Sequence, residues 1–218
     1  MNTRYGLWML SVVAVVAVLT AGCQSQQANQ SQKTFLYNGK DLTGLKPYPA
    51  DAGHWSAKGE ILYSTGKPNG YIRTEKVYQD FKLHVEWRWP AEPTNSGVFL
   101  FINGEDTTFP RCIEAQLQHT NAGDFVIMNH SGATVKGVHY EDAAKQFIGV
   151  KKFQASTEKP AGEWNTYDIV CKGDSIQLFV NGTLQNEATK TSEKSGFIGL
   201  QSEGGPIEFR NVYVEPLK

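Results

Sequence analysis

Short runs of alternating apolar and polar residues recur along most of the chain, and Gly, Pro, Asn and Asp separate them. Successive side chains of a β-strand point to opposite faces, so this alternation indicates half-buried strands. The pattern is clearest near the carboxyl end, where Lys172-Gly173-Asp174 and Asn181-Gly182 have the composition of hairpin turns. We predict an all-β chain with strands at Ile61–Ser64, Tyr71–Thr74, Phe81–Trp89, Gly97–Ile102, Arg111–Gln118, Asp124–Met128, Thr166–Cys171, Ser175–Val180, Gly196–Gln201 and Pro206–Val214.

One segment, Glu141–Phe147, departs from this pattern and is predicted to form a single helical turn before Gly149. No internal repeat is visible. A length of 218 residues suits one large β-domain. The chain has 21 basic and 22 acidic residues, so it lacks the excess positive charge that binding to nucleic acid or anionic lipid requires. A neutral ligand fits this composition better.

The amino terminus has the layout of an export signal. Arg4 supplies the positive start, and Leu7 to Leu19 form an apolar run that is short for a membrane span. The run ends in Leu19-Thr20-Ala21-Gly22-Cys23, which resembles a bacterial lipoprotein box, although leucine is commoner where Thr20 stands. We expect lipid on Cys23 and anchoring in a bacterial cell envelope, on the periplasmic side or at the outer membrane. Ordinary secretion and a retained anchor are the alternatives.

This interpretation divides the chain into three parts: a signal peptide at 1–22, a flexible tether at 23–34 and one domain at 35–218. The tether is predicted because residues 24–33 are rich in Gln, Ser and Asn. Within the domain, Cys112 and Cys171 form a disulfide if their strands lie side by side, and are otherwise buried thiols.

Two predicted strands carry polar stripes. In the predicted strand Phe81–Trp89, the polar residues His84, Glu86 and Arg88 alternate with apolar residues. In the predicted strand Arg111–Gln118, Glu114 and Gln116 alternate with apolar residues in the same way. If the two strands are near neighbours in one sheet, these side chains share an exposed face that can form a ligand groove. The alternative is that they merely face water, as in any half-buried antiparallel sheet.

The loop Thr120-Asn121-Ala122-Gly123-Asp124 follows the Glu114 strand directly, and His119 precedes it. We expect this loop at one end of the same face, where Asn121 and Asp124 can contact a ligand. An ordinary Asn/Gly turn is the alternative. Trp55 and Trp164 are possible sugar platforms, but a Trp at the start of a strand more often belongs to the core.

Several phrases, in this order and spacing, resemble the 3-keto-disaccharide hydrolase family over about residues 35–217. They are Tyr37-Asn38-Gly39-Lys40-Asp41-Leu42-Thr43-Gly44, Glu86-Trp87-Arg88, Asn95-Ser96-Gly97-Val98-Phe99, Ile113-Glu114-Ala115-Gln116, Glu163-Trp164-Asn165-Thr166-Tyr167, Gly199-Leu200-Gln201 and Glu208-Phe209-Arg210-Asn211. The resemblance implies a concanavalin-like jelly-roll β-sandwich of two antiparallel sheets and action on oxidised glycosides or oligosaccharides.

The chain departs from the family in two places. Ser202-Glu203 stands where the family commonly has an Asp-His pair after Gln201. This departure indicates either a different acid-base group or a subfamily with another substrate. Phe101 stands where an arginine is frequent, and an aromatic ring there could stack on a sugar.

A ketone at C3 of a sugar acidifies the C2 hydrogen, so a base can remove it, the C1 substituent can leave, and water can then add. This reaction needs a base, an acid and a group that stabilises the enolate oxygen. We assign the acid and base to Glu114 or Glu86, with His119 and Asp124 as alternates. Arg88, Asn95, Gln116, Asn121, Gln201 and Glu203 are the predicted substrate-binding residues.

Nothing in the sequence requires a cofactor, although a divalent metal bound through Glu, Asp and His could also stabilise the enolate. Two other functions stay open. One is conventional glycoside hydrolysis by two carboxylates. The other is a lectin-like module that binds carbohydrate without reaction, since a fold alone does not determine function.

Overall fold

The computed structural model describes Met1, residues 32–50 and residues 52–217, and in these the chain is all β and contains no helix. Residues 2–22 of the predicted signal peptide, Cys23 and most of the predicted tether lie outside the described residues. In the described part, no helix has the length and apolar character needed to cross a membrane.

The strands are numbered in chain order. They are β1 (Thr34–Phe35), β2 (Leu45–Tyr48), β3 (Trp55–Lys58), β4 (Ile61–Ser64), β5 (Gly70–Thr74), β6 (Phe81–Arg88), β7 (Gly97–Asn103), β8 (Arg111–Gln116), β9 (Phe125–Met128), β10 (Ala133–Val135), β11 (Val138–Tyr140), β12 (Phe147–Val150), β13 (Asn165–Lys172), β14 (Ser175–Val180), β15 (Thr183–Ala188), β16 (Phe197–Ser202) and β17 (Ile207–Pro216).

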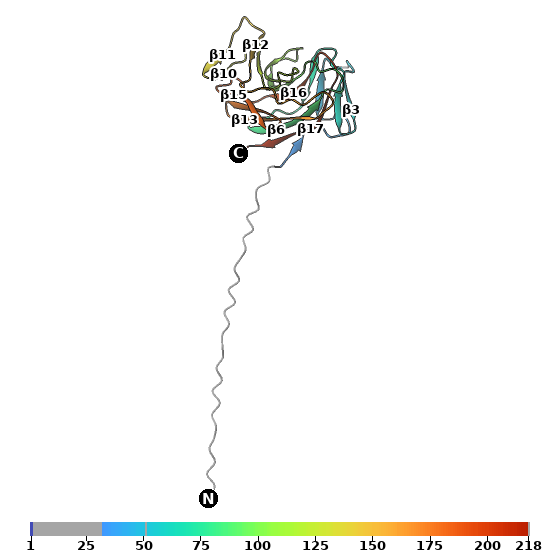
Figure 1. The fold of residues 1–218 in the computed structure, drawn as a ribbon, viewed down its shortest axis with the longest axis vertical. Coiled ribbons are helices and arrows are strands. Elements are labelled where there is room, and N and C mark those ends of the chain that lie inside the picture. Colours follow the sequence, from blue (N-terminus) through green and yellow to red (C-terminus); the bar gives the residue numbers. More distant parts are fainter. Residues whose placement is uncertain (2–31, 51, 218) are drawn as a thin grey trace. The chain divides into compact units, whose positions relative to one another are not determined.

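These strands form two large antiparallel sheets and one small hairpin (Figure 1). The eight-stranded sheet has the order β15-β14-β13-β6-β17-β4-β3, and β1 also pairs with β17. The seven-stranded sheet has the order β12-β9-β8-β7-β16-β5-β2, and β10 pairs with β11. One hydrophobic core contains residues of both large sheets, for example Val85 and Trp87 from β6 with Ile113 and Ala115 from β8. The two sheets therefore pack face to face as a sandwich.

Strand periodicity and turn chemistry account for most of this architecture. In β6 every second residue is buried, as the alternation of apolar and polar residues predicts. The β14–β15 turn places Asn181 at φ 48° and Gly182 at φ 79°, the left-handed conformations that a two-residue hairpin requires. All ten predicted strands are present, with ends that differ by a few residues, and the sequence pattern missed β1–β3, β10–β12 and β15.

Two other expectations are decided by the fold. The predicted helical turn at Glu141–Phe147 is wrong, because Phe147 already pairs with Met128 of β9 and so needs extended backbone. Cys112 and Cys171 are buried free thiols. They cannot be bridged as neighbours in one sheet, because β8 and β13 belong to different sheets.

Candidate functional site

The two polar stripes predicted from the sequence lie on opposite faces of the sandwich. Strand β6, with Glu86 and Arg88, belongs to the eight-stranded sheet, and β8, with Glu114 and Gln116, belongs to the seven-stranded sheet. Because the apolar residues of both strands point into the shared core, the polar residues between them point outward in opposite directions. The expectation that Glu86, Arg88, Glu114 and Gln116 share one groove is therefore wrong.

On the eight-stranded sheet, the carboxylate of Glu86 is fully engaged by neighbouring side chains. Arg210 Nε donates to Glu86 Oε2 at 2.6 Å, and Asn211 Nδ2 donates to Glu86 Oε1 at 2.8 Å. Burial opposes ionisation, but the hydrogen bonds from Asn211 and Arg210 outweigh it and keep the pKa of Glu86 below its ordinary value. Glu86 is therefore a carboxylate in a structural ion pair.

Arg88 is engaged in the same way on this face. Its Nε donates to Glu208 Oε2 at 2.7 Å. The guanidinium groups of Arg88 and Arg210 lie 4.7 and 4.1 Å from the centroid of the Trp164 ring. Trp164 thus holds two arginines rather than belonging to the core, and Arg210 pairs with Glu86.

The outer face of the seven-stranded sheet contains a pocket of about 190 Å³, here called the Glu114 pocket. Five of the predicted site residues line it, contributed by β8, by β16 and the residue after it, and by the segment before β7. Its full lining is Asn95, Phe109, Glu114, Gln116, Val126, Phe147, Gln201 and Glu203.

A glycine on the neighbouring strand decides where the carboxyl group of Glu114 lies. Gly97 is on β7, between β8 and β16, and pairs with Gln116. A β-carbon placed on Gly97 would lie 2.0 Å from Oε1 of Glu114, so the carboxyl group extends across the bare backbone of β7. No real side chain tolerates that distance. The absence of a side chain at Gly97 therefore allows Glu114 to reach the pocket. No role for Gly97 was predicted from the sequence.

Glu114 is a carboxyl group held in an environment that opposes its charge. The residue is only 4% exposed, and within the described part of the chain its Oε1 has no hydrogen-bond partner. Burial, together with the nearby charge of Glu203, raises the pKa of Glu114 to about 8. At neutral pH the group is therefore mainly a neutral acid, ready to donate a proton or a hydrogen bond.

Three further residues bring hydrogen-bonding groups to the same pocket. Gln201 Nε2 donates to Glu203 Oε2 at 2.7 Å, and Asn95 forms a backbone bridge with Glu203. Burial raises the pKa of Glu203, while hydrogen bonds from Asn95 and Gln201 partly oppose that rise. Among the described residues, Gln201 Oε1 and Asn95 Oδ1 are buried acceptors without a partner. A ligand carrying hydroxyl groups would satisfy both.

The opposite wall of the pocket is apolar. Phe109 and Phe147 form an edge-to-face pair with ring centroids 5.1 Å apart, and Val126 lies beside them on β9. Phe147 remains 43% exposed. A sugar ring carries hydroxyl groups at its edge and C–H groups on its faces. A pocket with one polar wall and one aromatic wall is therefore suited to bind it.

The loop after β8 does not contribute to the pocket as expected. His119, Asn121 and Asp124 are absent from its lining. His119 Nδ1 lies 3.4 Å from Oε2 of Glu158, and Asp124 accepts a hydrogen bond from the backbone N–H of Lys152 at 2.9 Å. These contacts hold the loop against the segment that contains Lys152 and Glu158. The loop is therefore the ordinary Asn/Gly turn that was the alternative to a ligand contact.

Two aromatic residues considered as sugar platforms are in the core instead. Phe101 is 2% exposed, and its ring lies 5.7 Å from that of Phe81. Trp55 is 6% exposed and packs against Phe209. Within the described residues, no three His, Cys, Asp or Glu side chains gather closely enough to hold a metal ion.

Comparisons with known proteins agree with this fold. The family model described as a 3-keto-alpha-glucoside-1,2-lyase-like domain matches residues 32–215. A candidate glycosyl hydrolase from Parabacteroides distasonis has a similar structure, with a TM-score of 0.63 and 24% identity over 85% of this chain and 100% of its own. A Bacillus licheniformis β-glucanase has a TM-score of 0.56 and 16% identity over 88% of this chain and 100% of its own.

The Bacillus subtilis carbohydrate-binding module CBM66 is also similar, with a TM-score of 0.56 and 14% identity over 84% of this chain and 99% of its own. The comparison with curated proteins gave no match. At these identities the structural likenesses show that the chain has the jelly-roll fold of concanavalin and the glucanases.

Proposed function

Because the chain belongs to the family of 3-keto-alpha-glucoside-1,2-lyase-like domains, we propose that it cleaves the glycosidic bond of 3-keto-glycosides or 3-keto-disaccharides. The family makes the chain a carbohydrate-active protein of glycosidase type. The observation that supports the finer proposal is the Glu114 pocket, which is lined by a neutral carboxyl group, a second carboxyl group and two amide side chains whose buried oxygens lack a partner among the described residues.

The two carboxyl groups supply the acid and the base of the reaction. Glu203 is half-buried beside Gln201 and removes the C2 proton, which the C3 ketone acidifies. Glu114 holds a proton at neutral pH and gives it to the oxygen that leaves C1. Water then adds across C1 and C2. Its oxygen bonds to C1, its proton returns to Glu114, and C2 recovers the proton held by Glu203, so both groups end as they began.

Gln116 is the residue we assign to the enolate oxygen that develops at C3. Its Oε1 accepts hydrogen bonds from the backbone N–H groups of Leu117 and Gln118, at 2.9 and 2.7 Å. These bonds fix the orientation of the amide, so its NH₂ group is the end left to donate. Preorganised donors of this kind stabilise charge that forms during a reaction. Asn95 and Gln201 would accept hydrogen bonds from the sugar hydroxyls.

The test is glycosidic cleavage by the purified protein, measured with a 3-keto-disaccharide and with its unoxidised parent, each with and without chelator. We expect release of monosaccharide from the keto sugar alone. Glu203→Gln should lower that rate by about 10²- to 10⁴-fold, the usual contribution of a general base. Glu86→Gln is the matched control, because it makes the same change on the opposite face and should leave the rate nearly unaltered.

Each other outcome identifies an alternative. Release from both sugars would identify a conventional glycoside hydrolase and contradict the keto-sugar proposal. Saturable binding without release would identify a lectin-like module, an alternative favoured by the similarity of the fold to a carbohydrate-binding module. A Glu203→Gln protein with full activity would remove Glu203 from the mechanism.

We also propose that the chain is exported and anchored in a bacterial envelope through lipid on Cys23, on the basis of the apolar run and the Ala21-Gly22-Cys23 ending. Cells that express the full chain and are fed a labelled fatty acid should incorporate the label into this protein. Cys23→Ser should abolish incorporation and leave a longer, unprocessed chain. Equal labelling of both proteins would contradict the proposal.

A further inference from the structure

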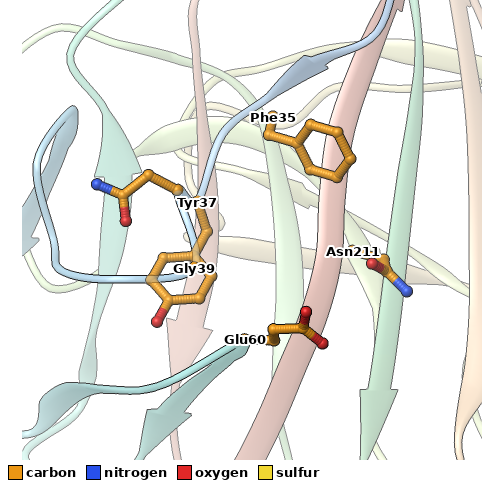
Figure 2. A pocket seen from close by; sticks show the side chains of 6 residues that line it. Phe35, Tyr37, Gly39, Glu60 and Asn211 are labelled. Atoms are coloured by element: carbon orange, nitrogen blue, oxygen red, sulfur yellow. The ribbon is translucent and has the colours of Figure 1, made fainter.

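A second pocket, larger than the first, lies against the other sheet. It has a volume of about 360 Å³ and is lined by Phe35, Tyr37, Asn38, Gly39, Glu60 and Asn211. We call it the Phe35 pocket (Figure 2). Its volume is within the range of roughly 300 to 1,000 Å³ that is usual for small-molecule sites. Asn211 lies on β17 of the eight-stranded sheet and bonds Glu86, so this pocket is on the face opposite the Glu114 pocket.

The aromatic residue that gives the pocket its name is unusually exposed. Phe35 is 56% exposed, although its ring contacts that of Tyr213, with centroids 5.4 Å apart and the two planes inclined at 58°. Figure 2 shows Phe35, Glu60 and Asn211 on different sides of the pocket. An exposed ring held in place by a neighbouring ring is suited to stacking against the C–H face of a sugar.

The polar groups of the pocket are held in place by local structure. Asn38 Oδ1 accepts from the backbone N–H groups of Lys40 and Asp41, at 2.8 and 2.9 Å, which fixes the loop that contains Gly39. Asn211 has φ 49° and stands at a register shift between β17 and β6. Such bulges redirect a side chain away from the regular strand pattern. Its Nδ2 donates to Glu86, which orients its Oδ1 as an acceptor.

The charge of the lining narrows the class of ligand. Among the described residues that line the pocket, Glu60 is acidic and none is basic. The lining therefore offers no cationic partner to an anionic ligand such as a phosphate, a sulfated sugar or a uronic acid. An aromatic ring with carboxylate and amide oxygens around it matches a neutral sugar, whose hydroxyl groups donate to those oxygens.

We propose that the Phe35 pocket is a second, non-catalytic carbohydrate site, which binds one ring of a neutral glycan by stacking on Phe35 and by hydrogen bonds to Glu60 and Asn211. This site does not depend on the chemistry at the Glu114 pocket. Because the two pockets open on opposite faces, a glycan bound at Phe35 leaves the other pocket free. The second site would keep the protein on a glycan-rich surface by raising the effective concentration of sugar near it.

The experiment is an NMR titration of the ¹⁵N-labelled protein with neutral tetrasaccharides of glucose, mannose and galactose. The side-chain amides of Asn38 and Asn211 report on this site, and those of Gln116 and Gln201 report on the Glu114 pocket. We expect saturable shifts of Asn38 and Asn211 with at least one sugar. Phe35→Ala should weaken that binding by about tenfold, the order of magnitude of an aromatic contact.

Val138→Ala is the control, because Val138 is also an exposed apolar residue, 53% exposed, on the β10–β11 hairpin. It should bind as the unaltered protein does. The proposal is overturned if none of the sugars shifts Asn38 or Asn211, or if Phe35→Ala binds equally well. It is also overturned if deleting residues 24–31 shifts these resonances and the sugars do not, since the chain's own preceding segment would then occupy the pocket.

Discussion

Glu114→Gln is expected to lower the cleavage of a 3-keto-disaccharide by about 10²- to 10⁴-fold, because the amide keeps the size of the side chain but cannot give up a proton. In the unaltered protein, activity should fall as pH rises past about 8, where Glu114 loses the proton it donates. A pH profile of kcat/KM measures both effects. Two results would contradict the role of Glu114 as the acid. One is full activity of the variant, and the other is a decrease of activity above about pH 8 that the variant still shows.

The same substitution should make the folded protein more stable in alkali. The pKa of Glu114 rises from 4.5 to about 8 on folding, so between these values the unfolded chain releases a proton that the folded chain retains. Stability therefore falls as pH rises from 4.5 to 8 and is constant beyond. The rise corresponds to roughly 5 kcal/mol of stability lost by pH 9. Glu114→Gln should remove this loss, as urea unfolding at pH 5 and pH 9 can measure.

Glu86→Gln provides a control of opposite sign. Hydrogen bonds from Asn211 and Arg210 lower the pKa of Glu86, so its ionised form contributes stability above its unfolded pKa and loses it as pH falls. The amide variant should therefore be less stable than the unaltered protein at pH 9, where Glu114→Gln is more stable. If both variants shift stability in the same direction, the burial of Glu114 is not the source of its effect.

The sequence predicted the strands well because the determinants are local. Alternation identifies a strand and tells which side chains face the core, as Leu83, Val85 and Trp87 do in β6. It also selected Glu114 and Gln116 correctly as outward residues that line one pocket. What alternation cannot tell is to which sheet a strand belongs, since β6 pairs with β13 and β17, both far away in the chain.

That limit explains the error over Glu86. Two strands with similar polar stripes look equivalent in the sequence, and only long-range pairing places them on opposite faces. It also explains why Phe109 and Phe147 were missed, because these residues come from a loop and an edge strand that meet only in the folded sheet. Gly97 was part of a family-like phrase, but its role depends on the side chain of Glu114 on the adjacent strand.

Gly97→Ala is expected to lower turnover by at least about 100-fold, the effect of displacing a reacting group by about 1 Å. The added methyl group would lie 2.0 Å from Oε1 of Glu114, so the carboxyl group must leave its place over β7. Gly97 does not have a positive φ, so alanine fits the backbone itself. Steady-state kinetics with the 3-keto-disaccharide, together with a melting curve, separate loss of activity from loss of folding.

Gly149→Ala is the matched control, because Gly149 lies on β12 of the same sheet and a β-carbon there meets nothing within 4 Å. It should leave activity unchanged. A double-mutant cycle gives the sharper result. In a Glu114→Ala background the clash is gone, so Gly97→Ala should have almost no further effect on residual activity or stability. If Gly97→Ala lowers activity and stability equally with and without the Glu114 side chain, Gly97 is needed only for the backbone conformation and does not position the acid.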